Sequence, residues 1–375
     1  MEKQISVYRR ACVQTVHEDG SYILKDTLNG AHVRLEGAGR RIWELLEYPC
    51  AMPDIAGKLA GEFSESIDVI AEETEKYIQQ MVERGLVEQS DGLPTAIDEQ
   101  RYRYLWLLKR ALLNLIYPEH ELRIRYLEEA PSDLDKLERM RFLRDVRYRQ
   151  PDRYASLIDA KLSFGPTKSA PLRFPHTMIG LPALDNIERC AEQIFKDGIA
   201  GDFMEAGVCQ GGATIFLRAL QVAYGQQQRR TWVADSFQGL PPPQTEPDIQ
   251  ANIDLSESKF PSIAVSLEIV RDNFDRYNLL DGGVCFLNGW FSETLPSAPV
   301  GQLALLRLDA DLYGSTRDIL TSLHDKVSPG GFILVDDYGA FAVCRQAVDE
   351  FREERSIADP LKWISECCVY WRKRG

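Results

Sequence analysis

The sequence lacks any apolar run of the about 18–20 residues that a membrane-spanning helix needs. Residues 1–10 are charged and have no apolar core of the kind a secretory signal carries. Positive charge is also scarce: the formal net charge is −13, which repels the phosphate backbone of nucleic acids. These absences predict a soluble, cytoplasmic protein that binds neither membranes nor nucleic acids. Six arginines between Arg139 and Arg153 are a local exception, which we interpret as a solvated helix face or a dimer rim.

The eight cysteines form no CxxC motif, and no set of Cys and His has the spacing of zinc ligands. We therefore expect them to be reduced and mostly packed. The 375 residues exceed the usual size of one domain, about 100–200 residues, so we expect more than one. Turn-forming residues at 89–94 interrupt the periodic sequence and predict the end of a first domain, residues 1–92.

The first domain reads as β followed by α, the order of a small winged-helix fold. Apolar periodicity and turn residues predict the elements. The expected strands are 11–17, 21–25, 31–35 and 86–89, and the expected helices are 39–46, 52–62 and 66–84. The first three strands should form a meander, because short turn sequences connect them.

This order of elements, with ArgIleTrpGluLeuLeu at 41–46 and GluArgGlyLeuValGlu at 83–88, resembles the PqqD-like domains over residues 5–90. The resemblance implies that a leader peptide adds as a strand beside residues 31–35, against the helix 67–82. Two alternatives share this outline, a dimerisation module and a DNA binder. The helix 66–84 carries five acidic and two basic residues, which disfavours insertion into a DNA groove.

Residues 93–175 are expected to be a helical linker or lid that also serves dimerisation. Leu105, Leu108, Leu112 and Leu115 repeat at helical spacing and predict a helix over 102–117. Such a stripe is typical of a core or a subunit interface. We therefore expect a homodimer or a higher homo-oligomer.

The third region, residues 176–375, alternates strands and helices, starting with a strand at 202–206. It leads into a glycine-rich turn that contains Gly207 and Gly211, followed by a helix at 214–224. Glycines at such a crossing let the backbone approach a ligand, although the spacing is not that of the dinucleotide fingerprint. The next strand, 231–235, ends in Asp235, where a carboxylate could accept hydrogen bonds from ribose hydroxyls. Together these features predict a cofactor site.

Three further strands supply more candidates. Trp290 follows a strand at 284–287 and is placed either against an adenine ring or in the core. Strands at 303–308 and 331–335 end in Asp309-Ala310-Asp311 and in Asp336-Asp337. Carboxylates that converge at strand ends are costly unless a cation binds, and Mg²⁺ prefers oxygen ligands. The alternative is that these aspartates cap a helix or lie in solvated turns.

Residues 100–375 resemble the macrocin O-methyltransferase (TylF) family. The matching segments are 176–181, 185–186, 232–237, 239–243, 288–291, 307–311 and 335–339. The resemblance implies an α/β, class I Rossmann-like fold that uses S-adenosylmethionine and a divalent metal such as Mg²⁺. It implies Asp309, Asp336 and Asp337 as metal ligands, with Asp309 also our candidate general base.

The resemblance also implies the cofactor-binding residues. Glu205, Gly207, Asp235 and Ser236 would hold S-adenosylmethionine and Thr177 and Met178 would close over it, with Gly211 and Trp290 as further candidates from the pattern above.

The predicted activity is therefore O-methyl transfer, and the first domain suggests the acceptor. If residues 1–92 bind a leader peptide, the acceptor belongs to a ribosomally made peptide, and we favour a carboxylate such as the C-terminus of a lasso-type peptide. One alternative is a sugar hydroxyl of a glycosylated natural product. Another is a non-catalytic scaffold that delivers peptide.

Overall fold

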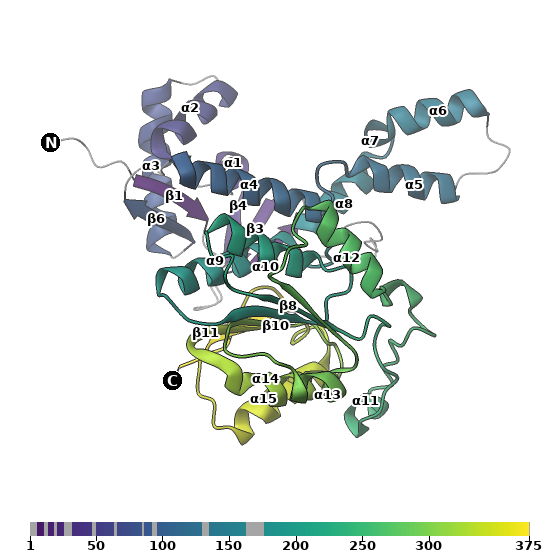
Figure 1. The fold of residues 1–375 in the computed structure, drawn as a ribbon. Helices are drawn as coiled ribbons and strands as arrows, with labels where there is room; N and C mark the ends of the chain where they lie inside the picture. Colours follow the sequence, from purple (N-terminus) through teal and green to yellow (C-terminus); the bar gives the residue numbers. More distant parts are fainter. Residues whose placement is uncertain are drawn as a thin grey trace. The chain divides into compact units, whose positions relative to one another are not determined.

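The fold is described from a computed structural model (Figure 1). It describes residues 6–10, 14–18, 21–25, 32–46, 50–63, 66–84, 86–91, 96–129, 135–162 and 176–374. The chain divides into two units, 1–107 with 362–365, and 108–361 with 366–375. This division falls inside a helix, whereas the predicted break at 89–94 lies partly outside the described residues.

The first unit contains the predicted meander. Strands β2 (Gln14–Glu18), β3 (Ser21–Lys25) and β4 (His32–Leu35) pair antiparallel in that order, which leaves β4 at the edge of its sheet. A second sheet has the order β5-β1-β6, from Cys50–Ala51, Ser6–Arg10 and Val87–Asp91. The strand β1 was not predicted, and the strand expected at 86–89 is present as β6 and pairs antiparallel with β1. Residues 11–13 of the predicted first strand lie outside the described part.

The predicted helices of this unit are present as α1 (Gly37–Leu45), α2 (Met52–Phe63) and α3 (Ile67–Glu83). They bury one apolar face each, because Trp43, Leu59 and Ile78 belong to one core with Leu24 and Leu35 of the meander. The acidic residues of α3 lie on its exposed side.

The middle region is helical, as predicted. Its helices are α4 (Ala96–Leu112), α5 (Glu119–Glu129), α6 (Lys136–Arg144), α7 (Val146–Arg149) and α8 (Pro151–Leu162). The helix expected at 102–117 begins and ends earlier, because the chain turns at Asn114, whose φ is 52°. Leu105, Leu108 and Leu112 are buried, whereas most arginines between Arg139 and Arg153 are exposed.

The second unit carries a mixed sheet with the order β12-β13-β11-β10-β7-β8-β9. The strands are β7 (Asp202–Ala206), β8 (Thr231–Asp235), β9 (Val284–Asn288), β10 (Leu303–Leu308), β11 (Val327–Val335), β12 (Lys362–Trp363) and β13 (Val369–Arg372). Strands β7 to β11 are parallel, and β13 is antiparallel to β11. The fold is therefore the predicted Rossmann-like α/β class.

Helices cover both faces of this sheet. Helices α9 (Leu181–Lys196) and α10 (Gly212–Ala223) lie on one face, and α14 (Tyr313–Leu323) and α15 (Ala342–Glu354) lie on the other (Figure 1). The strand order reverses between β7 and β10, so a crevice opens at their carboxyl ends, where ligands bind in such sheets. Among the described residues, no helix is both long and apolar enough to cross a membrane.

Candidate active site

The crevice at the reversal of strand order is shaped by Gly207. Its φ is +88°, and a Cβ atom there would lie 1.7 Å from the carbonyl oxygen of Asp309. Gly207 N–H donates to Ala234 O, and Asp309 N–H donates to Ala206 O, both at 2.9 Å. Only glycine lets the loop after β7 pass this close to the loop after β10.

The segment 176–179 forms one wall of a pocket over this loop. A Cβ on Gly212, the first residue of α10, would lie 2.1 Å from the carbonyl oxygen of His176, so the segment crosses directly over the helix N-terminus. The described residues that line the pocket are His176, Thr177, Met178, Ile179, Glu205, Val208, Cys209, Gln210, Ala213, Arg307 and Asp309. The pocket thus brings together Thr177, Met178, Glu205 and Asp309, which the sequence predicted from distant segments.

The other expected cofactor residues lie around the end of β8. Asp235 accepts hydrogen bonds from the backbone N–H groups of Val208 and Phe237, both at 2.7 Å, and burial raises its pKa. The Ser236 hydroxyl donates to Gly239 O at 2.6 Å. Gly211 adopts φ +85° at the start of α10, and Trp290 is half-buried after β9.

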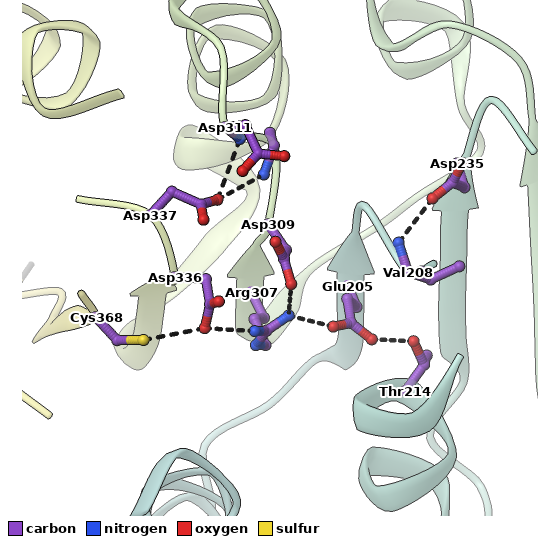
Figure 2. Close-up of polar contacts among 11 residues, drawn as sticks. Glu205, Val208, Thr214, Asp235, Arg307, Asp309, Asp311, Asp336, Asp337 and Cys368 are labelled. Carbon is purple, nitrogen blue, oxygen red and sulfur yellow. Dashed lines mark hydrogen bonds and ion pairs between the residues drawn. The ribbon is translucent and has the colours of Figure 1, made fainter. Parts of the chain in front are cut away.

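Arg307 connects the end of β7 to the ends of β10 and β11 (Figure 2). This guanidinium is 2% exposed and donates to Glu205, to Asp309 at 3.0 Å and to Asp336 at 2.6 Å. Glu205 also accepts from the Thr214 hydroxyl. Burial raises the pKa of Glu205 to about 7, although the nearby Arg307 opposes that rise. Arg307 was not among the predicted site residues.

A group of three carboxylates lies beside this ion-pair network. Oxygen atoms of Asp309, Asp311 and Asp337 all lie within 4.8 Å of one another. Burial, followed by the neighbouring carboxylates, raises the pKa of Asp309 to about 6, that of Asp311 to about 7 and that of Asp337 well above its usual range. In the described part of the chain, no basic side chain forms an ion pair with Asp311 or Asp337.

Asp336 is not a member of this group and has different hydrogen-bond partners. It accepts from Arg307, and from the Cys368 thiol with an Sγ-to-oxygen distance of 3.1 Å. The expected metal set of Asp309, Asp336 and Asp337 therefore differs from the observed group by one member, Asp311. The two-residue spacing of Asp309 and Asp311 was the sequence signal for it, because both leave the same strand end.

The arrangement suits the two ligands that the sequence predicted. Two of the three clustered carboxylates, Asp311 and Asp337, form no ion pair among the described residues, and a hard divalent ion would stabilise such a group of oxygen donors. The glycine-lined crossing, the N-terminus of α10 and the carboxylates Glu205 and Asp235 suit a cofactor that carries an amino group and a ribose. Both sites meet at Asp309 and Arg307.

Replacing Gly207 by alanine tests the close approach of the two loops. The added methyl group meets the backbone of Asp309 and occupies an unfavourable φ, so we expect the free energy of unfolding to fall by at least about 2 kcal/mol. Chemical denaturation measures this change. The matched control is Gly282→Ala, where nothing lies within 4 Å of the added atom. Equal stability of the two variants would contradict the described crossing.

Comparisons with known proteins match both parts of the chain. The family model described as macrocin-O-methyltransferase (TylF) matches residues 101–373, and the one described as coenzyme PQQ synthesis protein D (PqqD) matches residues 17–87.

Individual proteins match the larger part. The chain is 48% identical over 198 residues, 52% of this chain and 75% of the relative, to 8-demethyl-8-(2,3-dimethoxy-alpha-L-rhamnosyl)-tetracenomycin-C 4'-O-methyltransferase of Streptomyces olivaceus. It is 45% identical over 201 residues, 53% of this chain and 78% of the relative, to mycinamicin III 3''-O-methyltransferase of Micromonospora griseorubida. The solved structure of the O-methyltransferase NovP matches this chain with a TM-score of 0.58 and 36% sequence identity. The match covers 73% of this chain and 100% of NovP.

Proposed function

We propose that this chain, which belongs to the macrocin-O-methyltransferase (TylF) family, methylates a hydroxyl group of a glycosylated natural product. It is an S-adenosylmethionine-dependent O-methyltransferase with an N-terminal PqqD domain. The observation that carries the acceptor proposal is the 48% identity to an enzyme whose name describes a rhamnosyl-bearing compound methylated at O-4'. This favours the sugar alternative over the peptide carboxylate that the sequence first suggested.

The reaction needs an oriented acceptor oxygen and a base. The oxygen forms a bond to the methyl carbon while the carbon–sulfur bond of the sulfonium breaks, and the hydroxyl proton passes to a base. We assign the cofactor to Glu205, Gly207, Gly211, Asp235, Ser236 and Trp290, with Thr177 and Met178 covering it. Asp309 lines the same pocket as Thr177, Met178 and Glu205, so a cofactor held by these residues would lie next to that carboxylate.

We assign a divalent metal to Asp309, Asp336 and Asp337. When bound, such an ion would orient the acceptor oxygen and lower the pKa of its hydroxyl. Asp309 and Asp337 already belong to the observed carboxylate group, and Asp336 lies beside it on Arg307. The residues therefore fit the predicted ion, provided that Asp336 exchanges its bond to Arg307.

We place the general base at Asp311 rather than at Asp309. A carboxylate that ligates a metal is a poor base, and Asp311 is the member of the group outside the predicted ligand set. Its carboxylate oxygen lies within 4.8 Å of those of Asp309 and Asp337, so it can take a proton released beside them.

A second candidate acceptor is a ribosomally made peptide, and the match of residues 17–87 to PqqD favours it. The strand β4 lies at the edge of its sheet, and Leu35 at its end shares a core with Ile78 of α3. A peptide could add to this edge as a further strand. Methyl transfer would then act on a tethered substrate at high local concentration.

Transfer of a radiolabelled methyl group decides between these acceptors. The full chain is incubated with labelled S-adenosylmethionine, either with rhamnosylated and related glycosylated acceptors or with synthetic candidate precursor peptides that include their leader segments. We expect an alkali-stable methyl ether on the sugar. A labelled peptide, or a methyl ester that mild alkali hydrolyses, would overturn the first proposal in favour of the second. Label in neither acceptor would reject both.

A further inference from the structure

The turn that carries the carboxylate group is held from two sides. Asp311 adopts φ 55°, a left-handed conformation that is unfavourable for a residue with a side chain. Asp337 accepts from the backbone N–H groups of Ala310 and Asp311, both at 3.1 Å. The N–H groups that follow in the first turn of α14, which begins at Tyr313, have no acceptor within that helix and need one from elsewhere.

The second anchor is Asp248, which comes from a different part of the chain. Its carboxylate accepts from Tyr313 N–H at 2.8 Å and from Gly314 N–H at 3.1 Å. The N-cap residue of α14, Leu312, supplies no side-chain cap of its own. Asp248 therefore caps α14 from 65 residues earlier in the sequence. This leaves Asp309 and Asp311 free to face the site instead of serving as helix caps.

The surroundings of Asp248 are built for this contact. The side chain is 2% exposed, and the Thr245 hydroxyl donates to it at 2.6 Å. A Cβ atom on Gly314 would lie 2.9 Å from Thr245 Cγ2, so glycine permits the close approach. Asp248 belongs to the short helix α11 (Glu246–Gln250), in the connection between β8 and the helix α12 (Leu267–Arg276).

We propose that Asp248 is a positioning residue for the metal carboxylates. The two aspartates Asp337 and Asp248 hold the backbone of residues 310–314 from either end of the turn. Asp337 would share its carboxylate between this turn and a cation, whereas Asp248 lies outside the carboxylate group and holds only the turn. The inference rests on the proposed metal site, and it adds a residue that touches neither metal nor cofactor.

The substitution Asp248→Asn tests this role in the full chain. The amide keeps the size of the side chain but can accept only one of the two backbone hydrogen bonds. We expect the dissociation constant for Mn²⁺, measured by electron paramagnetic resonance, to rise by about tenfold or more. The dissociation constant for S-adenosylhomocysteine, measured by calorimetry, should stay within about twofold of that of the unmodified chain. The cofactor candidates Glu205 and Asp235 lie on β7 and β8, whereas the turn that Asp248 anchors follows β10. A merely structural loss would weaken both ligands alike.

The matched control is Asp135→Asn, the same substitution at another helix cap. Asp135 accepts from the N–H groups of Leu137 and Glu138 at the start of α6. Amide hydrogen exchange in the metal-free protein gives a second measurement, and Asp248→Asn should speed exchange over residues 310–314 where Asp135→Asn does not.

The outcomes separate the two proposals. If the unmodified chain binds no Mn²⁺, the metal assignment fails, and faster exchange at 310–314 still supports Asp248 as the anchor of the turn. If Asp248→Asn matches the control in both Mn²⁺ affinity and exchange, the role of Asp248 is overturned while the metal site stands.

Discussion

Replacing Asp337 by asparagine is expected to lower kcat by about two orders of magnitude or more, and to weaken Mn²⁺ binding at least about tenfold. Asp337 belongs both to the predicted ligand set and to the observed carboxylate group. The amide oxygen of asparagine can still accept from Ala310 and Asp311, so the turn is kept while the charge is removed. Labelled methyl transfer and Mn²⁺ titration measure the two effects.

The control is Asp272→Asn, an exposed residue that pairs with Arg276 on the surface of α12. Unchanged Mn²⁺ affinity in Asp337→Asn would reject the metal site. The variants Asp336→Asn and Asp311→Asn then assign the remaining roles. We expect Asp336→Asn to weaken Mn²⁺ binding, and Asp311→Asn to lower turnover while Mn²⁺ still binds. The reverse pattern would make Asp311 the ligand.

The buried strands of the second unit could be predicted from sequence because both of their faces are covered. Their residues form nearly continuous apolar runs, and β7, β8 and β10 have the expected bounds. The strand β1 could not be predicted in this way. Its sequence, SVYRR, has no such run, and it is a strand because β5 and β6 pair with it from distant parts of the chain.

The residues of the candidate site likewise include some that the sequence predicts and some that only the structure identifies. Parallel topology alone predicts that residues at or just after the carboxyl ends of β7, β8, β10 and β11 converge. Glu205, Asp235, Asp309 and Asp337 could therefore be predicted from the sequence. The choice between Asp311 and Asp336 depends on which backbone and side-chain groups each carboxylate meets, and no pattern of residues encodes it. The role of Asp248 is even harder to predict from the sequence, because it caps a helix that begins 65 residues later in the chain.

Arg307 did leave a signal, since it is a charged residue inside the apolar strand LALLRL. A buried charge requires partners, because its desolvation is costly. The sequence could therefore predict that acidic groups surround it. Which three they are follows from the register that sets Arg307 opposite Glu205 on β7 and Leu334 on β11.

Replacing Arg307 by methionine is expected to lower the free energy of unfolding by about 3–5 kcal/mol, because it leaves Glu205, Asp309 and Asp336 without their shared cation. Denaturation in urea with a chelator, near pH 8, measures this loss. The control is Arg153→Met, which removes an ion pair whose side chains are 51% and 56% exposed, and it should cost at most about 1 kcal/mol.

The loss caused by Arg307→Met should depend on pH in a defined direction. The pKa of Glu205 in the folded protein is raised to about 7 from 4.5, so folding favours its protonated form, and this stabilising contribution disappears as the pH rises through that value. Without the guanidinium the pKa of Glu205 rises further. At about pH 5.5 the Glu205 carboxyl of the variant is then neutral, so the loss of its cationic partner costs little. Near pH 8 the folded variant must either bury an unpaired Glu205 carboxylate or keep a proton that the unfolded chain has released, and both lower its stability. The difference in stability from the unmodified chain should therefore be smaller at about pH 5.5 than near pH 8. A loss that equals that of Arg153→Met, or that stays constant with pH, would show that Arg307 does not balance these carboxylates.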